Sequence, residues 1–168
     1  MAESLGKKFE AVTKEQWKKS FPGSFIFRIP DPQSGYSGWG GSNMCDFIGF
    51  VAEGINNNTK GQLFLIEVKS HKGNTIPWTA IRQYDKLLTY RDQKDVHVGI
   101  IIWFIDHDKV IWCPVEEAKK MHDDGLKSIS IKLLQNRLYN ILELPSIKKR
   151  VFLDTDYTPL LTFYLEKS

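Results

Sequence analysis

Two charged residues, Glu67 and Lys69, stand near the end of an apolar run that reads LFLIEVK from Leu63. In a β-strand, residues i and i+2 point to the same face, so these two side chains share one face. Apolar residues occupy both faces of the run, which predicts an internal strand, and a charge on an internal strand needs a partner or a function. The alternative is an ordinary surface ion pair on a solvated strand edge.

A second carboxylate, Asp46, precedes Glu67 by 20 intervening residues. The Asn-rich segment between them predicts a turn, so that residues 44–70 form a β-hairpin and bring Asp46 close to Glu67. Two carboxylates and the backbone carbonyl of Val68 offer the hard oxygen ligands that Mg²⁺ prefers, and Mn²⁺ could take the same place. Because Lys69 could stabilise charge that develops on a phosphate, the set predicts metal-dependent phosphodiester hydrolysis.

The elements that position these residues follow from the hydrophobic pattern and its breaks. We expect helices over residues 5–19, 75–90 and 115–124, strands over 24–29, 44–54, 62–70, 96–105 and 109–114, and a strand or extended edge over 126–131. This order predicts a mixed α/β domain with a central β-sheet flanked by helices.

The length of 168 residues is enough for one domain with a substantial core, and 42% hydrophobic with 26% charged residues is an ordinary globular composition. We expect a single domain over residues 1–168 with its core over about 5–132. The extension 133–168 either completes that core or contributes to a dimer.

The site residues belong to a longer pattern. Asp46 followed by Glu67-Val68-Lys69 resembles the signature of the PD-(D/E)xK nuclease superfamily, without its proline. Over about residues 5–132 the chain also resembles the RecU branch, the Holliday-junction resolvases of Gram-positive bacteria and their phages. That match rests on the segments SNMCDFIGF, FLIEVKSHKGNTIPWTAIRQYDKLL, VGIIIWF, KVIWCPVEEA and GLKSISI. The resemblance implies a restriction-endonuclease-like fold and a Mg²⁺-dependent endonuclease of DNA recombination and repair that resolves four-way junctions as a homodimer.

The resemblance also implies a role for each matching residue. Asp46 and Glu67 would be metal ligands and Lys69 the catalytic lysine. Gln83 matches a glutamine on the helix after the lysine strand, and Glu10 matches a first-helix glutamate that approaches the metal site. For Gln83 and Glu10 the alternative is an ordinary solvated helix position.

The chain departs from the RecU pattern in two places. RecU proteins carry a longer insertion that forms a stalk, whereas the comparable segment here is a Pro- and Gly-rich loop over 30–43, with a disordered linker as the alternative. The loop's Tyr36 and Trp39 could pack against the domain or stack on bases. A basic N-terminal arm is also absent before the first expected helix. A shortened chain fits a phage-type version of the branch.

The mildly basic charge, net +3 with a pI of about 8.8, permits DNA binding without demanding it. Basic side chains that could line a phosphate track around the site are Lys7, Lys8, Lys72, Arg82 and Lys127. Ordinary solvated surface charge is the alternative for each of them.

The two cysteines, Cys45 and Cys113, form neither a disulfide framework nor a metal pattern, and we expect buried thiols in a reducing compartment. No apolar run reaches the length of a membrane span, and no signal peptide is apparent. We therefore expect a cytoplasmic protein, in a bacterium or a phage-infected host, with no membrane partner.

Paired cuts in a two-fold symmetric junction favour a symmetric dimer, for which the apolar strand 96–105 or the aromatic tail could supply the interface. Two other functions stay open. One is a restriction- or repair-type nuclease acting on other DNA structures, and the other is a non-catalytic DNA-binding protein of the same fold. The intact Asp-Glu-Lys set counts against the last.

Overall fold

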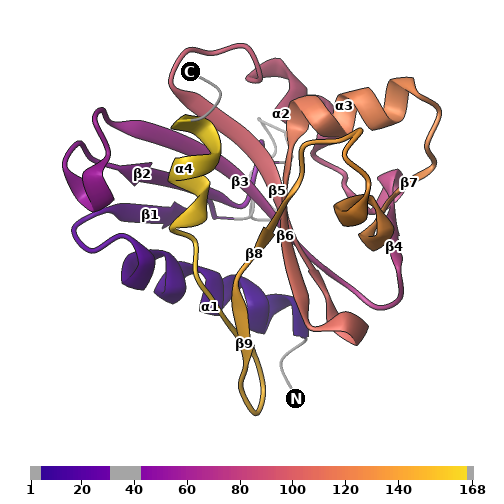
Figure 1. The fold of residues 1–168 in the computed structure, drawn as a ribbon, viewed down its shortest axis with the longest axis horizontal. Coiled ribbons are helices and arrows are strands. Elements are labelled where there is room, and N and C mark those ends of the chain that lie inside the picture. Colours follow the sequence, from indigo (N-terminus) through magenta and orange to yellow (C-terminus); the bar gives the residue numbers. More distant parts are fainter. Residues whose placement is uncertain (1–4, 31–42, 166–168) are drawn as a thin grey trace, which may run out of the picture.

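The computed structural model describes residues 5–30 and 43–165. Within them, six strands form a mixed sheet in the order β1-β2-β3-β5-β6-β8 (Figure 1). Strands β3 and β5 are parallel, and the other neighbouring pairs are antiparallel. The sheet consists of β1 (Phe25–Arg28), β2 (Phe47–Val51), β3 (Gln62–His71), β5 (Val96–Phe104), β6 (Lys109–Pro114) and β8 (Leu142–Leu144).

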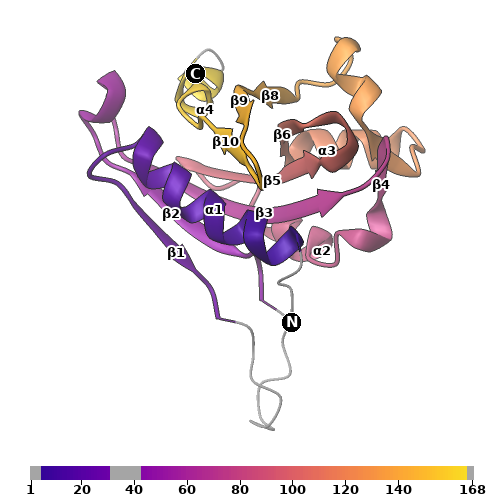
Figure 2. The same ribbon diagram turned by 90° about the horizontal axis from the view of Figure 1, so that it is seen from below.

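Helices cover both faces of this sheet, which confirms the expected fold class. Helix α1 (Leu5–Ser20) runs alongside β1, β2 and β3 (Figure 2), and α4 (Pro159–Leu165) packs in the same hydrophobic cluster. Helices α2 (Tyr84–Thr89) and α3 (Val115–Asp123) contribute to a second cluster on the opposite face. No helix in the described part of the chain is long and apolar enough to cross a membrane.

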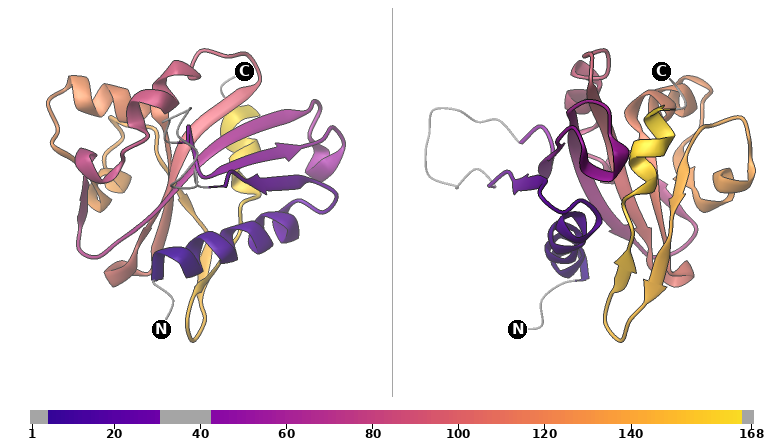
Figure 3. Two further views of the ribbon diagram at one scale, coloured as in Figure 1. Left: turned by 180° about the vertical axis from the view of Figure 1, so that it is seen from behind. Right: turned by 60° about the vertical axis from the view of Figure 1, so that its left-hand side comes forward.

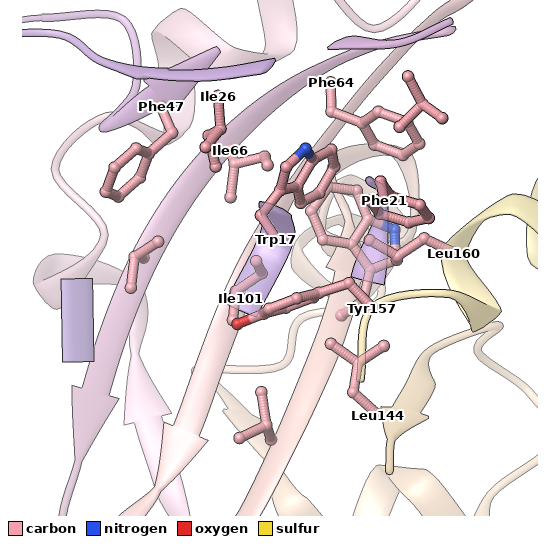
Figure 4. Packing of buried hydrophobic residues seen from close by; sticks show 14 of the residues in the cluster. Trp17, Phe21, Ile26, Phe47, Phe64, Ile66, Ile101, Leu144, Tyr157 and Leu160 are labelled. Carbon is pink, nitrogen blue, oxygen red and sulfur yellow. The ribbon is translucent and has the colours of Figure 1, made fainter. Parts of the chain in front are cut away.

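The cluster under α1 is built around Trp17, which is fully buried (Figure 4). Its ring lies 5.2 Å from that of Phe64 on β3 and 5.9 Å from that of Tyr157 in the tail, centroid to centroid. The indole packs so closely on β2 that a Cβ added at Gly49 would lie 2.7 Å from it, so only glycine fits there. Tail residues thus form part of the same core as the first helix.

The helix expected over 75–90 is wrong in its first half. Residues Thr75–Pro77 form a strand, β4, which pairs with β7 (Ser128–Ser130), and a 3-10 turn, Trp78–Ala80, separates it from α2. Ile76 pairs with Ile129, and both side chains are buried. A β-branched side chain fits this pleated position well, and the long-range pairing outweighs the local helical pattern.

The other expected elements are present, with shifted ends. The hairpin over 44–70 forms, although β2 begins only at Phe47, and the strand expected over 96–105 is central. Because residues Val98–Phe104 are buried within the chain itself, β5 offers no free surface for the dimer interface suggested above. The weakly patterned tail contributes β8 to the main sheet, and β9 (Ser146–Lys148) pairs with β10 (Leu153–Thr155). Tyr36 and Trp39 lie outside the described residues.

Candidate functional site

The candidate site forms where β3 extends beyond its neighbour β2. The pairing of β2 with β3 ends at Phe47 and Ile66, whereas the pairing of β3 with β5 continues as far as His71. The C-terminal part of β3 therefore has a strand partner on only one side among the described residues. Its backbone groups on the other side are open to side chains or ligands.

Asp46 occupies the position just before β2, and it forms hydrogen bonds with the β3 backbone beyond the last residue pair of the two strands. Its Oδ2 accepts a hydrogen bond from the backbone N–H of Val68 at 2.8 Å, and its own N–H donates to the carbonyl of Ile66 at 3.0 Å. In an extended strand the N–H and C=O of one residue point to the same side. The Val68 carbonyl therefore faces the Asp46 side, as a third oxygen next to the carboxylate.

Glu67 and Lys69 form an ion pair on one face of β3. Lys69 Nζ lies 2.5 Å from Glu67 Oε1, and the Glu67 side chain is 0% exposed while that of Lys69 is 24% exposed. The Lys69 ammonium is therefore a polar partner for Oε1 of Glu67. The other carboxylate oxygen, Oε2, has no hydrogen-bond partner among residues 5–30 and 43–165. A buried carboxylate oxygen without a partner is costly, and a cation or donor would relieve that cost.

Burial raises the pKa of Glu67 from 4.5 to about 7, and the nearby charge of Asp46 adds to this rise. Lys69 opposes the rise, and Glu10 contributes a smaller upward effect. The Glu67 carboxyl group therefore changes its protonation state near neutral pH. A divalent cation would favour its ionised form, because an adjacent positive charge lowers a carboxyl pKa.

Glu10 reaches this region from α1 and is held by Arg28 at the end of β1. Its Oε2 accepts from Nε of Arg28 at 3.2 Å and from Nη2 at 3.1 Å. Its charge contributes to the raised pKa of Glu67, and the role expected for Glu10 in the site stays a prediction. Arg28 was missed by the sequence reasoning, although a charge closing the short apolar segment FIFR was a usable signal.

Gln83 lies at the N-cap of α2 rather than within a helix. The neighbouring Ile81 and Leu87 pack in the same cluster as Leu65, which shares its strand face with Glu67 and Lys69. Among the described residues, Oε1 of Gln83 is buried without a hydrogen-bond partner. The side chain is therefore half-buried with its oxygen inaccessible to solvent, and its role in the site stays a prediction.

The basic residues expected to contact DNA come from separate elements. Lys7 and Lys8 lie in the first turns of α1, and Lys72 follows the end of β3 directly. Arg82 precedes α2, and Lys127 precedes β7. All except the half-buried Lys8 are exposed, so each could reach a phosphate backbone.

The chemistry of the donor set limits which metal could bind. Within residues 5–30 and 43–165, no group of three or more His, Cys, Asp and Glu side chains could hold a metal ion. The candidate ligands are two carboxylates, Asp46 and Glu67, with the Val68 carbonyl, which suits a cation that keeps several waters. Burial raises the pKa of the adjacent Cys45 thiol to about 12, and its Sγ donates to the carbonyl of Phe47 at 3.3 Å.

Comparison with known proteins adds a likeness in fold. No protein-family profile matches the chain, and no curated protein matches its sequence. Among similar solved structures is Archaeoglobus fulgidus Hjc, described as a Holliday junction resolvase from an archaeal hyperthermophile. It is 19% identical with a TM-score of 0.45, and the match covers 67% of this chain and 78% of that one.

Proposed function

We propose that this protein is a metal-dependent, structure-selective endonuclease that resolves four-way DNA junctions by paired phosphodiester cleavage. The observation that carries the proposal is the convergence of Asp46, Glu67 and Lys69 at the open edge of β3. The carboxylates of Asp46 and Glu67 and the ammonium of Lys69 meet beside the Val68 carbonyl of β3. Of the two carboxylates, that of Glu67 is fully buried. Such a set suits hydrolysis of a phosphodiester better than it suits structural stability.

Magnesium, or manganese in its place, fits this donor set. Asp46, Glu67 and the Val68 carbonyl would hold it, since all three supply hard oxygen atoms near the same end of β3. The unpartnered Oε2 of Glu67 is the atom most in need of a cation. When bound, the metal would act as a Lewis acid on the phosphate and favour deprotonation of a water.

The protein's own residues then orient and stabilise the reacting groups. The hydrogen bond from the Val68 N–H holds the Asp46 carboxylate in place at the edge of β3. The Lys69 ammonium, next to Glu67 and one-quarter exposed, can stabilise the negative charge that develops on the phosphate. At the margins of the site, Glu10 contributes a further carboxylate and Gln83 a side-chain amide.

Two features favour branched DNA as the substrate. The residues of the site and the segments around them resemble RecU-type resolvases, and the net charge of +3 suits a polyanionic partner. A four-way junction has two-fold symmetry, so paired cuts require two sites related in the same way, and we propose a homodimer. A restriction- or repair-type nuclease acting on other DNA structures is the second candidate, and the same site residues support it.

A cleavage assay tests these proposals. The protein is incubated with a synthetic four-way junction, a duplex, a flap and a single strand, with and without Mg²⁺, next to Asp46→Asn and Lys69→Ala. The expected result is paired nicks in the junction alone, lost in both variants. Equal cutting of plain duplex would favour the second candidate. Junction binding without cleavage under any metal would leave only a non-catalytic DNA-binding protein, and light scattering of the purified protein decides whether it is a dimer.

A further inference from the structure

The tail builds a basic hairpin that the site described above does not use. Strands β9 and β10 are joined by a tight turn in which the N–H of Lys149 donates to the carbonyl of Phe152 at 2.8 Å. The hairpin projects beyond the edge of the main sheet (Figures 1 and 3). Lys149 and Arg150 lie at its tip, and both are exposed.

A cavity of about 320 Å³ lies between this hairpin and the start of α1. Its walls carry four cationic side chains and one carboxylate: Lys8, Lys148, Lys149, Arg150 and Asp108. Lys148 is already paired with Asp108, at 2.5 Å. Lys8, Lys149 and Arg150 have no ion-pair partner in the part of the chain that the structure describes, so the cavity carries uncompensated positive charge.

The indole of Trp103 also lines this cavity. It is 6% exposed, and its Nε1 lacks a hydrogen-bond partner among residues 5–30 and 43–165. The cavity thus combines excess cationic charge with a nearly buried indole in its wall.

The cavity lies on the α1 face of the sheet, whereas Glu67 and Lys69 project from the opposite face near the same end of β3. Phe9 of α1 packs on Trp103, with ring centroids 5.4 Å apart. Successive residues of a helix are about 100° apart, so Lys8 and Glu10 emerge on opposite sides of Phe9. Trp103 in turn pairs with Ser70, the residue after Lys69. A polyanion that passes around this end of β3 could reach both places.

We propose that this cavity binds a backbone phosphate of the DNA substrate, so that the β9–β10 hairpin is a second DNA contact outside the cleavage site. The inference rests on the proposed function, because it takes DNA as the ligand. Lys8, Lys149 and Arg150 supply the charge, and Trp103 forms the floor. Charge complementarity selects the occupant, since an excess of cationic side chains around a small cavity suits a phosphate.

Binding of a fluorescein-labelled four-way junction in EDTA tests this without cleavage. Lys149→Gln with Arg150→Gln is compared with Lys94→Gln and Lys132→Gln, a control that removes the same charge from two exposed positions elsewhere. Each lost phosphate contact should reduce the slope of log K against log salt by about 0.9, so the hairpin variant, which loses one phosphate, should lose about 1 unit of slope. Its Kd at physiological salt should rise roughly tenfold or more, and that of the control less than about twofold.

The outcomes separate this inference from the proposed function. Unchanged affinity and slope in the hairpin variant would overturn the inference, even where the wild-type protein still cuts junctions. An equal loss in the control would also overturn it, because net charge alone would then explain the effect. Weaker binding in the hairpin variant alone supports the inference, whether or not Mg²⁺ brings about cleavage. If the wild-type protein binds no DNA, both proposals fail.

A second measurement tests the cavity itself. The side-chain N–H of Trp103 gives a separate signal in a ¹⁵N-correlated NMR spectrum, which Trp103→Phe identifies. We expect this signal to shift when a short duplex is added to the wild-type protein and to stay in place in the hairpin variant. A signal that does not move in the wild-type protein would show that the phosphate does not enter the cavity.

Discussion

The carboxylate of Asp46 accepts a hydrogen bond from the backbone N–H of Val68 at 2.8 Å, in a place where the β2–β3 ladder has already ended. One oxygen of the side chain thus replaces a strand partner, while the carboxylate charge raises the pKa of Glu67. The same hydrogen bond satisfies the Val68 N–H at the sheet edge and orients a candidate metal ligand. This arrangement leads to separate expectations for stability and for activity.

Asp46→Asn should separate these two roles. The amide oxygen of Asn can still accept from the Val68 N–H, so we expect the free energy of unfolding to change by less than about 1 kcal/mol. The negative charge is lost, and we expect junction cleavage to fall roughly 100-fold or more. Thermal unfolding and a cleavage time course measure the two effects. Cleavage within about twofold of wild type, in a folded variant, would remove Asp46 from the proposed site.

Glu67 should make the metal-free protein less stable as the pH rises. Its pKa is 4.5 in the unfolded chain and about 7 in the folded protein, so between these values the folded state holds the proton more tightly. Stability is therefore fully present below about pH 4.5, falls as the pH rises to about 7 and stays level above it. A shift of this size corresponds to a loss on the order of 3 kcal/mol.

Glu67→Gln should abolish this dependence, because the amide does not titrate. Urea unfolding of both proteins in EDTA, at several pH values across this interval, measures the difference. We expect the variant to gain stability relative to wild type as the pH rises. Parallel profiles would mean that the carboxyl group is already ionised, and so more solvated than its burial indicates.

Lys69→Met should reduce cleavage without weakening DNA binding. The variant keeps the apolar stem of the side chain and removes the ammonium that lies 2.5 Å from Glu67. We expect a loss of about 10²–10³-fold in cleavage rate, because charge on the phosphate is no longer stabilised. Junction affinity in Ca²⁺ should stay near that of wild type, and Lys132→Met on the surface serves as the control. A Kd that rises as much as the rate falls would instead make Lys69 a binding residue.

Tyr164→Phe tests whether the tail belongs to the folded core. The hydroxyl of Tyr164 accepts from Nε1 of Trp112 at 2.9 Å, and both residues are buried. Without the hydroxyl this indole N–H loses its acceptor, and we expect the free energy of unfolding to fall by about 1–3 kcal/mol. Leu165→Ala, at the exposed end of the same helix, should change it by less than about 0.5 kcal/mol. Equal, small effects in both variants would mean that α4 is only loosely attached.

Much of the site was predictable because its signals are local. Alternation along β3 places Glu67 and Lys69 on one face whatever the rest of the chain does, and the turn before it brings the Asp46 strand alongside. The same local patterns predicted the central position of β5. These predictions hold because neighbouring residues in a strand, and two strands joined by a short turn, leave little freedom in how they are arranged.

The tertiary structure decided what depends on residues far apart in the chain. Ile76 is in a strand because Ile129 pairs with it, and the weakly patterned tail is ordered because Tyr157 packs on Trp17. The raised pKa of Glu67 comes from burial and from its distance to Asp46, and neither follows from its position in the sequence. Local pattern thus determined which residues face the same way. Long-range packing determined which of them are buried, and burial sets the cost of a charge.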